Sequence, residues 1–241
     1  MLILENVSKA YYGCDKKAVD SLNLDVHEGE IFGFLGPNGS GKTTTVKIIT
    51  GILKPDNGKV LVNGYDVIKE PLKAKEKMGY VPDNPDIFNK LTGLEFLRFI
   101  SDIYKVDSKI RKSNIEKYGK IIEIYDALNM KIESYSHGMK QKLLILGALI
   151  HEPDLLIMDE PVIGLDTKAI KNLKEIMRSL SKQGRTVFIT THIMQIAEEI
   201  CDRIAIIKNG RILYTGTIND LKIKKDDKKD LEEIFLEMTE S

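Results

Sequence analysis

The sequence predicts an α/β fold that combines a parallel central sheet with an antiparallel N-terminal sheet and an inserted helical block. Short, continuously apolar segments at 31–35, 155–158 and 186–190 alternate with amphipathic stretches, which is typical of buried parallel strands joined by helices. Residues 1–30 alternate in polarity, as half-buried antiparallel strands do. Between residues 92 and 150, apolar side chains recur every three or four positions, which indicates helices.

The composition excludes several classes of function. Lys+Arg number 36 and Asp+Glu number 36, so the net charge is zero and no global basic field can hold nucleic acid. The two cysteines, Cys14 and Cys201, form no Cys-x-x-Cys pair, which excludes a thiolate zinc finger and a disulfide framework. They fit a reducing compartment. At 241 residues, the chain can bury a large core as one domain or as a domain with a subdomain.

The sequence carries no sign of a signal peptide or a membrane span. Its first residues lack a basic segment followed by a long apolar one. No apolar run approaches the roughly 20 residues that cross a bilayer. We therefore expect the protein to reach a membrane only through a partner.

The first strands are expected at 2–7 and 22–26, where polar and apolar residues alternate. Tyr11 and Tyr12 lie between them. Either tyrosine could stack on an adenine ring or pack on the small sheet, and the periodicity alone favours packing.

A glycine-rich loop at 36–43 follows the apolar strand 31–35 and precedes an amphipathic helix that begins at about Lys42. Its glycines let successive backbone N–H groups turn inward around a phosphate, and the positive end of the helix dipole faces the same anion. Lys42 adds a charge for the β- and γ-phosphates, and the Thr43 hydroxyl can ligate Mg²⁺. The residues expected to bind ATP in this stretch are Gly36, Pro37, Asn38, Gly39, Ser40, Gly41, Lys42, Thr43 and Thr44.

The next segments lead from this loop to the helical block. A strand at 60–62 runs into Asn63-Gly64, which is a strong hairpin signal. A polar helical stretch is expected at 71–79 and a strand at 80–81. The prolines in 82–85 force an exposed loop.

The remaining elements return to alternating strands and helices. The helix 168–182 connects the two apolar strands at 155–158 and 186–190. Residues 204–214 form a hairpin at the sheet edge. The tail at 222–233 mixes charges of both signs, so a solvated helix is expected there.

Three polar residues follow two of the apolar strands. Asp159 and Glu160 end one strand, and His192 follows the next. Because the carboxyl ends of parallel strands meet at one edge of an open sheet, these side chains should lie beside the phosphate loop. Asp159 can then hold magnesium, Glu160 can orient and deprotonate an attacking water, and His192 can sense the γ-phosphate.

The order of these motifs resembles an ATP-binding-cassette (ABC) nucleotide-binding domain along nearly the whole chain. The phosphate loop 36–43 stands for the Walker A motif, residues 135–139 for the signature, 155–160 for Walker B, 164–166 for the D-loop and His192 for the H-loop. The resemblance implies a P-loop NTPase fold with a RecA-like core, and ATP and Mg²⁺ as ligands. It also implies catalytic roles for Glu160, His192 and Lys42.

The resemblance further implies an ATP-dependent head-to-tail dimer, formed by two copies or with a second ABC subunit. Ser136, His137 and Gly138 of one copy would then contact the γ-phosphate held by the other, with Asp166 in the D-loop. Taken alone, Ser136 would be an ordinary helix N-cap. The chain departs from the family at His137, where glycine is usual, and at Asp83, which replaces a metal-binding glutamine.

These features lead us to expect an ABC ATPase domain at 1–220, with a helical subdomain at about 83–150 and a charged helical tail at 221–241. The protein would hydrolyse ATP on the cytoplasmic face of the membrane, bound to a separate transmembrane permease, and no nucleic-acid partner is expected. Similarity to ABC-2-type ATPases suggests export. The alternatives are a cassette ATPase acting on DNA or ribosomes and a nucleotide sensor without turnover.

The apolar side chains after the exposed loop suggest where the permease docks. Ile87, Phe88 and Leu91 are expected to help form a groove for a helix of that partner, with a role in the core as the alternative.

Overall fold

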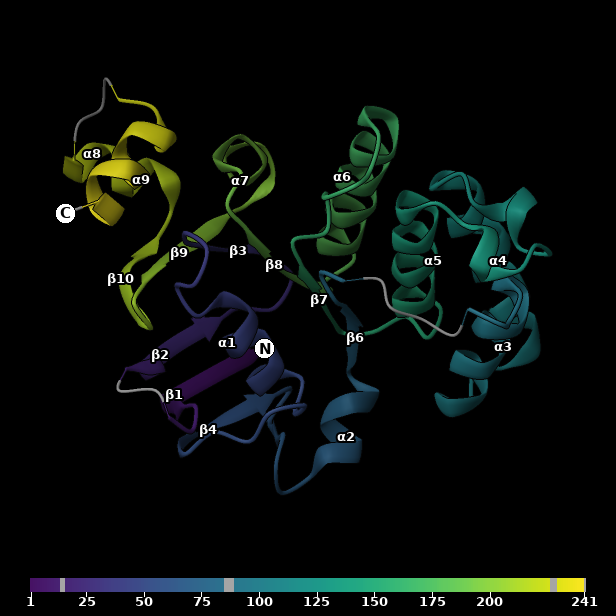
Figure 1. The fold of residues 1–241 in the computed structure, drawn as a ribbon, viewed down its shortest axis with the longest axis horizontal. Helices are drawn as coiled ribbons and strands as arrows, with labels where there is room; N and C mark the ends of the chain where they lie inside the picture. The colour runs from purple at the N-terminus through teal and green to yellow at the C-terminus, as the bar shows by residue number, and fades with distance from the viewer. Residues whose placement is uncertain (14–15, 85–88, 226–228, 241) are drawn as a thin grey trace.

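The computed structural model describes residues 1–13, 16–84, 89–225 and 229–240, and Figure 1 shows two sheets flanked by helices. The strands are β1 (Leu2–Ala10), β2 (Lys17–Val26), β3 (Ile31–Leu35), β4 (Asn57–Val62), β5 (Tyr65–Asp66), β6 (Met78–Val81), β7 (Leu155–Asp159), β8 (Thr186–Thr191), β9 (Arg203–Lys208) and β10 (Arg211–Gly216). The helices are α1 (Lys42–Ile49), α2 (Pro71–Glu76), α3 (Gly93–Ile103), α4 (Ser108–Ile121), α5 (His137–Leu149), α6 (Thr167–Lys182), α7 (Met194–Ile200), α8 (Ile218–Lys225) and α9 (Leu231–Glu240), with 3₁₀ turns η1 (Tyr125–Ala127) and η2 (Ile132–Ser134).

The N-terminal sheet is antiparallel, in the order β2-β1-β4-β5. Leu2 pairs with both Val26 and Val62, and all three side chains are buried on the inner face of this sheet. Asn63 and Gly64 join β4 to β5 with φ angles of 49° and 81°, the positive values that a tight hairpin turn needs. The structure confirms the predicted antiparallel strands and hairpin.

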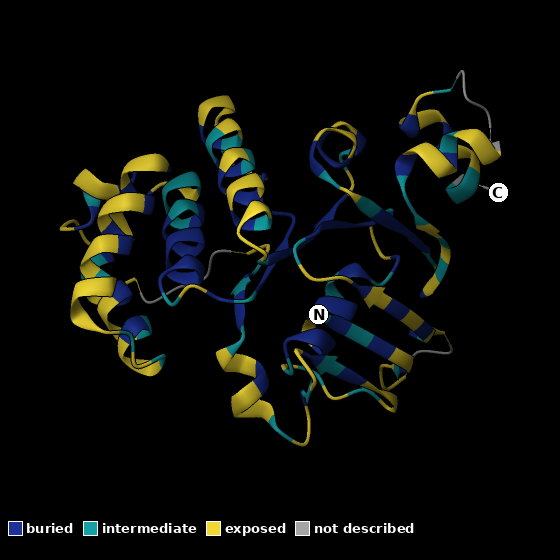
Figure 2. Cartoon of the chain, turned by 180° about the vertical axis from the view of Figure 1, so that it is seen from behind, coloured by how far each residue is buried: buried dark blue, intermediate teal, exposed yellow. Residues whose placement is uncertain are grey.

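The central sheet has the order β10-β9-β3-β8-β7-β6, and its strands are parallel from β9 to β6. Strand β10 pairs antiparallel with β9 at the edge, as the sequence predicts. Strands β3, β7 and β8 are buried on both faces, and Figure 2 shows the middle of the molecule in dark blue. Because Asp159 pairs with Thr190 and Thr190 pairs with Phe34, the carboxyl ends of these three strands lie level.

Three phenylalanines hold β3 against β8. The ring of Phe188 stacks on Phe32 with centroids 5.9 Å apart and an interplanar angle of 9°. It also lies 5.6 Å from Phe34. All three side chains are fully buried, so this cluster fixes the strand from which the glycine-rich loop emerges.

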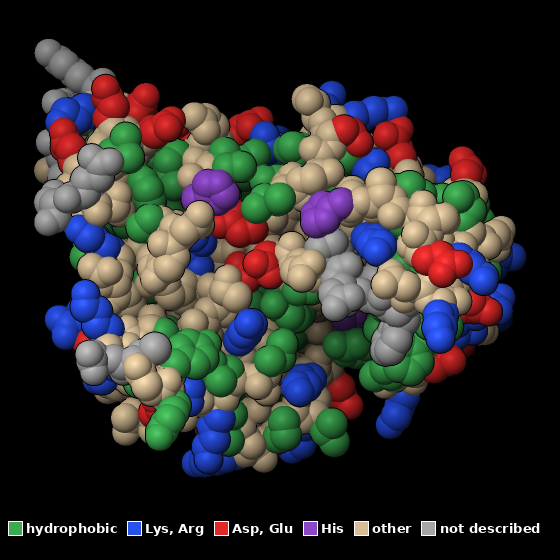
Figure 3. Space-filling model, viewed as in Figure 1, with side chains coloured by type: hydrophobic (Ala, Val, Ile, Leu, Met, Phe, Trp, Pro, Cys, Tyr) green, Lys and Arg blue, Asp and Glu red, His purple; other side chains and the backbone are tan. Residues whose placement is uncertain are grey.

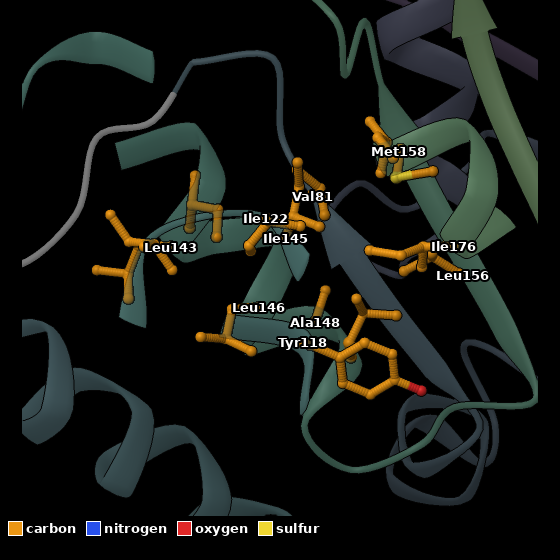
Figure 4. Packing of buried hydrophobic residues seen from close by; sticks show 14 of the residues in the cluster. Val81, Tyr118, Ile122, Leu143, Ile145, Leu146, Ala148, Leu156, Met158 and Ile176 are labelled. Atoms are coloured by element: carbon orange, nitrogen blue, oxygen red, sulfur yellow. The ribbon is translucent and has the colours of Figure 1, made fainter. Parts of the chain in front are cut away.

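Helices occupy the segment between β6 and β7, where the sequence has helical periodicity. Helix α5 lies at the centre of this group, and its apolar side chains meet Val81, Leu156 and Met158 from the sheet (Figure 4). Helix α4 ends at Ile121, inside the 92–150 stretch in which the apolar spacing predicts helices. The backbone of Glu123 adopts a positive φ of 60°, which stops the helix and turns Ile122 and Ile124 into the core.

The C-terminal tail differs from the solvated helix expected at 222–233. Two helices, α8 and α9, lie on either side of residues outside the described ranges. Leu231, Ile234 and Phe235 are buried against Met194 and Ala197 of α7. Charged residues dominate the tail by number, but these three apolar side chains share one face of α9 and anchor it.

The proposed docking segment is only partly described. Ile87 and Phe88 lie outside the described residues, so that part of the prediction stays open. Leu91 is half-buried and packs against the helical core, and its carbonyl accepts a hydrogen bond from the Ile132 N–H. These contacts favour the alternative of a core role for Leu91. Among the described helices, none is long and apolar enough to cross a membrane.

His151 connects the end of α5 to the rest of the helical block. Its ring stacks on Tyr104 with centroids 3.6 Å apart, and its Nε2 lies 3.0 Å from the Met78 carbonyl oxygen. Burial lowers the pKa of His151 from 6.5 to about 4, against the opposing effect of the bond to Met78. The ring is therefore neutral in the folded protein near pH 7.

This neutral histidine should make stability depend on pH. Below pH 6.5 the unfolded chain binds a proton that the folded ring takes up only near pH 4. The free energy of unfolding should fall by roughly 3 kcal/mol from this residue as the pH drops through that window. Urea unfolding of wild type and His151→Phe, which keeps the ring stack, should show a smaller loss in the variant. Equal losses in both proteins would contradict the assignment.

Candidate active site

The glycine-rich loop between β3 and α1 has no room for side chains at two of its glycines. A Cβ on Gly41 would lie 2.4 Å from the Ala18 carbonyl oxygen, and one on Gly36 would lie 2.5 Å from that of Ile207. Gly41 and Gly39 also have positive φ angles of 112° and 77°. The loop thus needs glycine for its shape, and its backbone N–H groups can approach an anion closely.

Lys42, the first residue of α1, lies buried in this loop. Its Nζ donates to the carbonyl oxygens of Gly36 at 2.8 Å and Pro37 at 3.3 Å. The same ammonium lies 3.4 Å from Oε1 of Glu160. The sequence prediction of a lysine and a carboxylate at one edge of the sheet is therefore matched by a direct contact.

Asp159 is completely buried at the end of β7. Its Oδ1 accepts a hydrogen bond from the Thr190 hydroxyl, while its Oδ2 has no hydrogen-bond partner in the described part of the chain. Burial raises the pKa of Asp159, and hydrogen bonds from Thr190 and Thr43 oppose that rise. The Thr43 hydroxyl therefore lies beside this carboxylate.

Glu160 follows with a left-handed backbone, φ 47°. Its N–H lies 3.2 Å from the carbonyl oxygen of Thr190 and 3.0 Å from the Thr190 Oγ1, so one threonine fixes both acids. Its Oε1 accepts a hydrogen bond from Nδ1 of His192 at 3.0 Å. The other oxygen, Oε2, is buried and has no hydrogen-bond partner among the described residues.

Lys42, Glu160 and His192 line one cavity of about 340 Å³, while the buried Asp159 does not line it. Figure 3 shows acidic and histidine side chains around a hollow in the middle of this face. Asp83 lines the same cavity, with its side chain exposed to solvent. The lining residues are Ala18, Asn38, Gly39, Gly41, Lys42, Thr43, Thr44, Asp83, Glu160, Ile163 and His192.

The oxygen atoms at the cavity fit a magnesium ion. Mg²⁺ prefers oxygen ligands and keeps several waters, so one or two carboxylates suffice beside substrate phosphates. The unpartnered Oδ2 of Asp159 and the Thr43 hydroxyl meet that requirement, with Asp83 nearby. The described residues contain no cluster of three or more His, Cys, Asp or Glu side chains able to hold a metal by themselves.

The two tyrosines expected near an adenine ring differ in position. The Tyr11 hydroxyl lies 3.3 Å from Oγ1 of Thr44, which lines the cavity. The Tyr12 side chain is fully exposed. The geometry thus brings Tyr11, and not Tyr12, to the phosphate loop.

The signature residues do not line this cavity. Ser136 is the N-cap of α5 and accepts a hydrogen bond from the Met139 N–H at 3.3 Å. Asp166 caps α6 by accepting from the Ala169 N–H at 2.9 Å, and that bond together with Lys142 lowers the pKa of Asp166.

The signature and the D-loop nevertheless contact each other. A Cβ on Gly138 would lie 2.6 Å from the Gly164 carbonyl oxygen. A Cβ on Gly164 would in turn lie 2.4 Å from the His137 ring. The structure therefore places Ser136, His137 and Gly138 beside the D-loop, and none of these three signature residues lines the cavity of their own chain.

Thr190, Ala18 and Ile163 contribute to the site although no sequence pattern singles them out. Thr190 was read only as part of a strand, although its hydroxyl and carbonyl hold both acids. Its position at the end of β8, two residues before His192, could have indicated a role. Ala18 and Ile163 also line the cavity, but small and apolar residues carry no signal of this kind.

Comparisons with known proteins find one matching family and several similar sequences. The sequence profile of the family described as "ABC transporter" matches residues 19–163. The linearmycin resistance ATP-binding protein LnrL of Bacillus subtilis (strain 168) is 39% identical over 224 residues, covering 92% of this chain and 70% of that protein.

Two solved structures are also similar. An ATP-binding subunit of an ABC transporter superposes with a TM-score of 0.93 at 30% identity, covering 99% of both chains. A dimeric ATP-binding cassette in a post-hydrolysis state, bound to ADP and phosphate, has a TM-score of 0.80 at 27% identity and covers 90% of this chain and 99% of its own.

Replacing Lys42 tests whether the cavity binds phosphates. In Lys42→Ala the loop loses its buried ammonium, so affinity for Mg-ATP should fall about 100-fold, the loss expected for a charge-assisted contact. Isothermal calorimetry measures this directly. Lys47→Ala, at an exposed position on the same helix, should bind normally. Unchanged affinity in Lys42→Ala would remove the loop from the binding site.

Proposed function

The chain belongs to the ABC transporter family as an ATP-binding and ATP-hydrolysing protein, and we propose that it powers export through a separate membrane-spanning partner. The observation that carries the catalytic part is the contact of Glu160 with both Lys42 and His192 at the mouth of the phosphate loop. The carboxyl end of a buried strand and the loop that would bind the phosphates thus meet at one cavity.

The reaction is the attack of water on the γ-phosphorus of ATP, with cleavage of the bond to the β-phosphate oxygen. Loop N–H groups and Lys42 would bind the β- and γ-phosphates. Glu160 would hold the attacking water and accept its proton, for which the unpartnered Oε2 is suited. The products are ADP and phosphate.

The metal ligands proposed here are Thr43, Asp159 and Asp83. When bound, Mg²⁺ would neutralise charge that develops on the transferred phosphoryl group. Asp159 is held in place by Thr190, and burial makes its negative charge costly without a cation nearby. Asp83 lines the same cavity and its charge raises the pKa of Asp159, which supports a position close to the ion.

His192 would position Glu160 and contact the γ-phosphate. If Nδ1 donates to Glu160, Nε2 is the atom that would face a phosphate oxygen, and it can donate to that oxygen only when the ring carries a second proton. Through His192, the position of the Glu160 carboxylate would then depend on whether the γ-phosphate is bound.

The complete site would need a second chain. Ser136, His137 and Gly138 lie away from the cavity of their own chain, which supports the head-to-tail dimer in which they meet the partner's nucleotide. Ser136 begins a helix, where N–H groups and a hydroxyl favour an anion. A similar cassette has been solved as a dimer with ADP and phosphate.

The proposal that transport is export rests on the name of one relative. The similar protein from Bacillus subtilis is named for resistance to linearmycin, which fits removal of a compound from the cell. The two similar structures are described as an ATP-binding subunit of an ABC transporter and an ATP-binding cassette, which favours transport over action on DNA or ribosomes. The protein would then lie on the cytoplasmic side, held at the membrane by its partner.

Glu160→Gln separates binding from hydrolysis. The amide keeps the shape of the side chain but cannot accept the proton, so turnover should fall at least about 100-fold while Mg-ATP still binds. Light scattering with Mg-ATP should show a dimer, because the bound nucleotide is no longer consumed. A variant with wild-type turnover would refute the assigned base.

The transport role is tested by isolating the protein from membranes. The tagged Glu160→Gln chain is extracted from cells with a mild detergent. We expect a polytopic membrane protein to copurify with it in a constant molar ratio. The matched control is the same extraction after a salt wash that removes loosely bound proteins. Recovery of nucleic acid or ribosomes instead of a membrane protein would favour the alternative function.

A further inference from the structure

A second cavity lies in the helical block between α3, α4 and η1. Its volume is about 370 Å³, similar to that of the active site, and the two cavities share no lining residue. We propose that it binds a small anionic amphiphile, with a phosphate or carboxylate head and an aliphatic tail. The lining residues are Leu94, Arg98, Ser108, Arg111, Lys112, Ile115, Tyr125, Leu128 and Asn129.

One part of this cavity is apolar. Ile115 and Leu128 belong to the buried core of the helical block and are only 6% and 3% exposed. Leu94 packs against the same core and is half-buried. Because these three residues come from α3, α4 and the turn after η1, they form a continuous apolar floor suited to a hydrocarbon chain.

Another part is basic. Arg111 is fixed by an ion pair in which its Nη1 lies 2.8 Å from Oδ1 of Asp102. Within the described ranges, Arg98 and Lys112 form no ion pair. The wall therefore presents two cations without an ion-pair partner, although Arg98 interacts electrostatically with Glu95 and Lys112 with Glu116.

The carboxylates close to these cations have other partners. Glu95 accepts hydrogen bonds from Thr92 in a capping box. Glu116 pairs with Lys120 at 2.6 Å, and Asp107 caps α4. The N–H groups of Arg98 and Lys112 would thus be open to an added anion, because Glu95 and Glu116 have their closest contacts elsewhere.

The aromatic ring at the rim argues for an aliphatic tail. The ammonium of Lys120 lies over the ring of Tyr125, 5.5 Å from its centroid. That face of the ring is therefore occupied by a cation, and a nucleobase could not stack on it. The apolar floor and the cationic wall together suit an alkyl phosphate or an alkyl carboxylate as a ligand better than they suit a nucleotide.

This inference does not rest on the proposed export function. It follows from residues of the helical block alone, and none of them touches the active site. It can therefore fail or succeed independently.

Octyl phosphate below its micelle concentration is the probe, titrated into the full chain by calorimetry with Mg-ADP present to occupy the phosphate loop. We expect saturable binding of one molecule per chain. The double variant Arg98→Ala/Lys112→Ala should weaken it by about 10-fold, because two charged contacts are lost. Lys109→Ala is the matched control, since this exposed lysine lies on α4 but does not line the cavity.

Two further titrations distinguish the contribution of the anionic head of the ligand from that of its hydrocarbon tail. Inorganic phosphate and octanol should each bind at least about 10-fold more weakly than octyl phosphate, because each lacks one half of the ligand. The proposal is overturned if octyl phosphate does not bind. Equal affinity in the double variant and the wild type, or equal affinity for inorganic phosphate, also overturns it. Circular dichroism of the variants establishes that they fold.

Discussion

The hydrogen bonds of Thr190 are the constraint on which the active site depends. Its hydroxyl donates to Asp159 and also accepts from the Glu160 N–H, and its carbonyl accepts from the same N–H. These bonds exist only because β7 and β8 pair in the register that sets Asp159 opposite Thr190. A shift of the strand register by one residue would turn every side chain of the strand to the opposite face of the sheet. It would thereby separate the acids from the phosphate loop.

The electrostatics of the cavity follow from this placement. Two consecutive acids are held near one ammonium, that of Lys42, so the buried part of the site carries an excess of negative charge. Burial already raises the pKa of Asp159, which shows that its charge is poorly compensated by the protein. A divalent cation between these acids and the phosphates of ATP would supply the missing positive charge.

Local patterns in the sequence were enough to predict the loop, the strands and the two acids, because each depends on neighbouring residues. The glycines at 36, 39 and 41 and the apolar run before Asp159 are of this kind. The position of Thr190 before His192 indicates a role only weakly, because its bond to Asp159 depends on the register between two strands whose paired residues are 31 positions apart. The packing of α9 was missed for a related reason. The charged residues that precede α9 dominate the composition of the tail, and the burial of Leu231, Ile234 and Phe235 depends on contact with α7.

The contact between His137 and Gly164 has a consequence for how this chain can evolve. The ring occupies the space that a Cβ at position 164 would need, and a Cβ at position 138 would lie 2.6 Å from the Gly164 carbonyl oxygen. A side chain at 164 becomes sterically accessible only after a smaller residue replaces His137, and the positive φ of 79° at Gly164 would still disfavour it. Substitutions at the two positions are therefore epistatic.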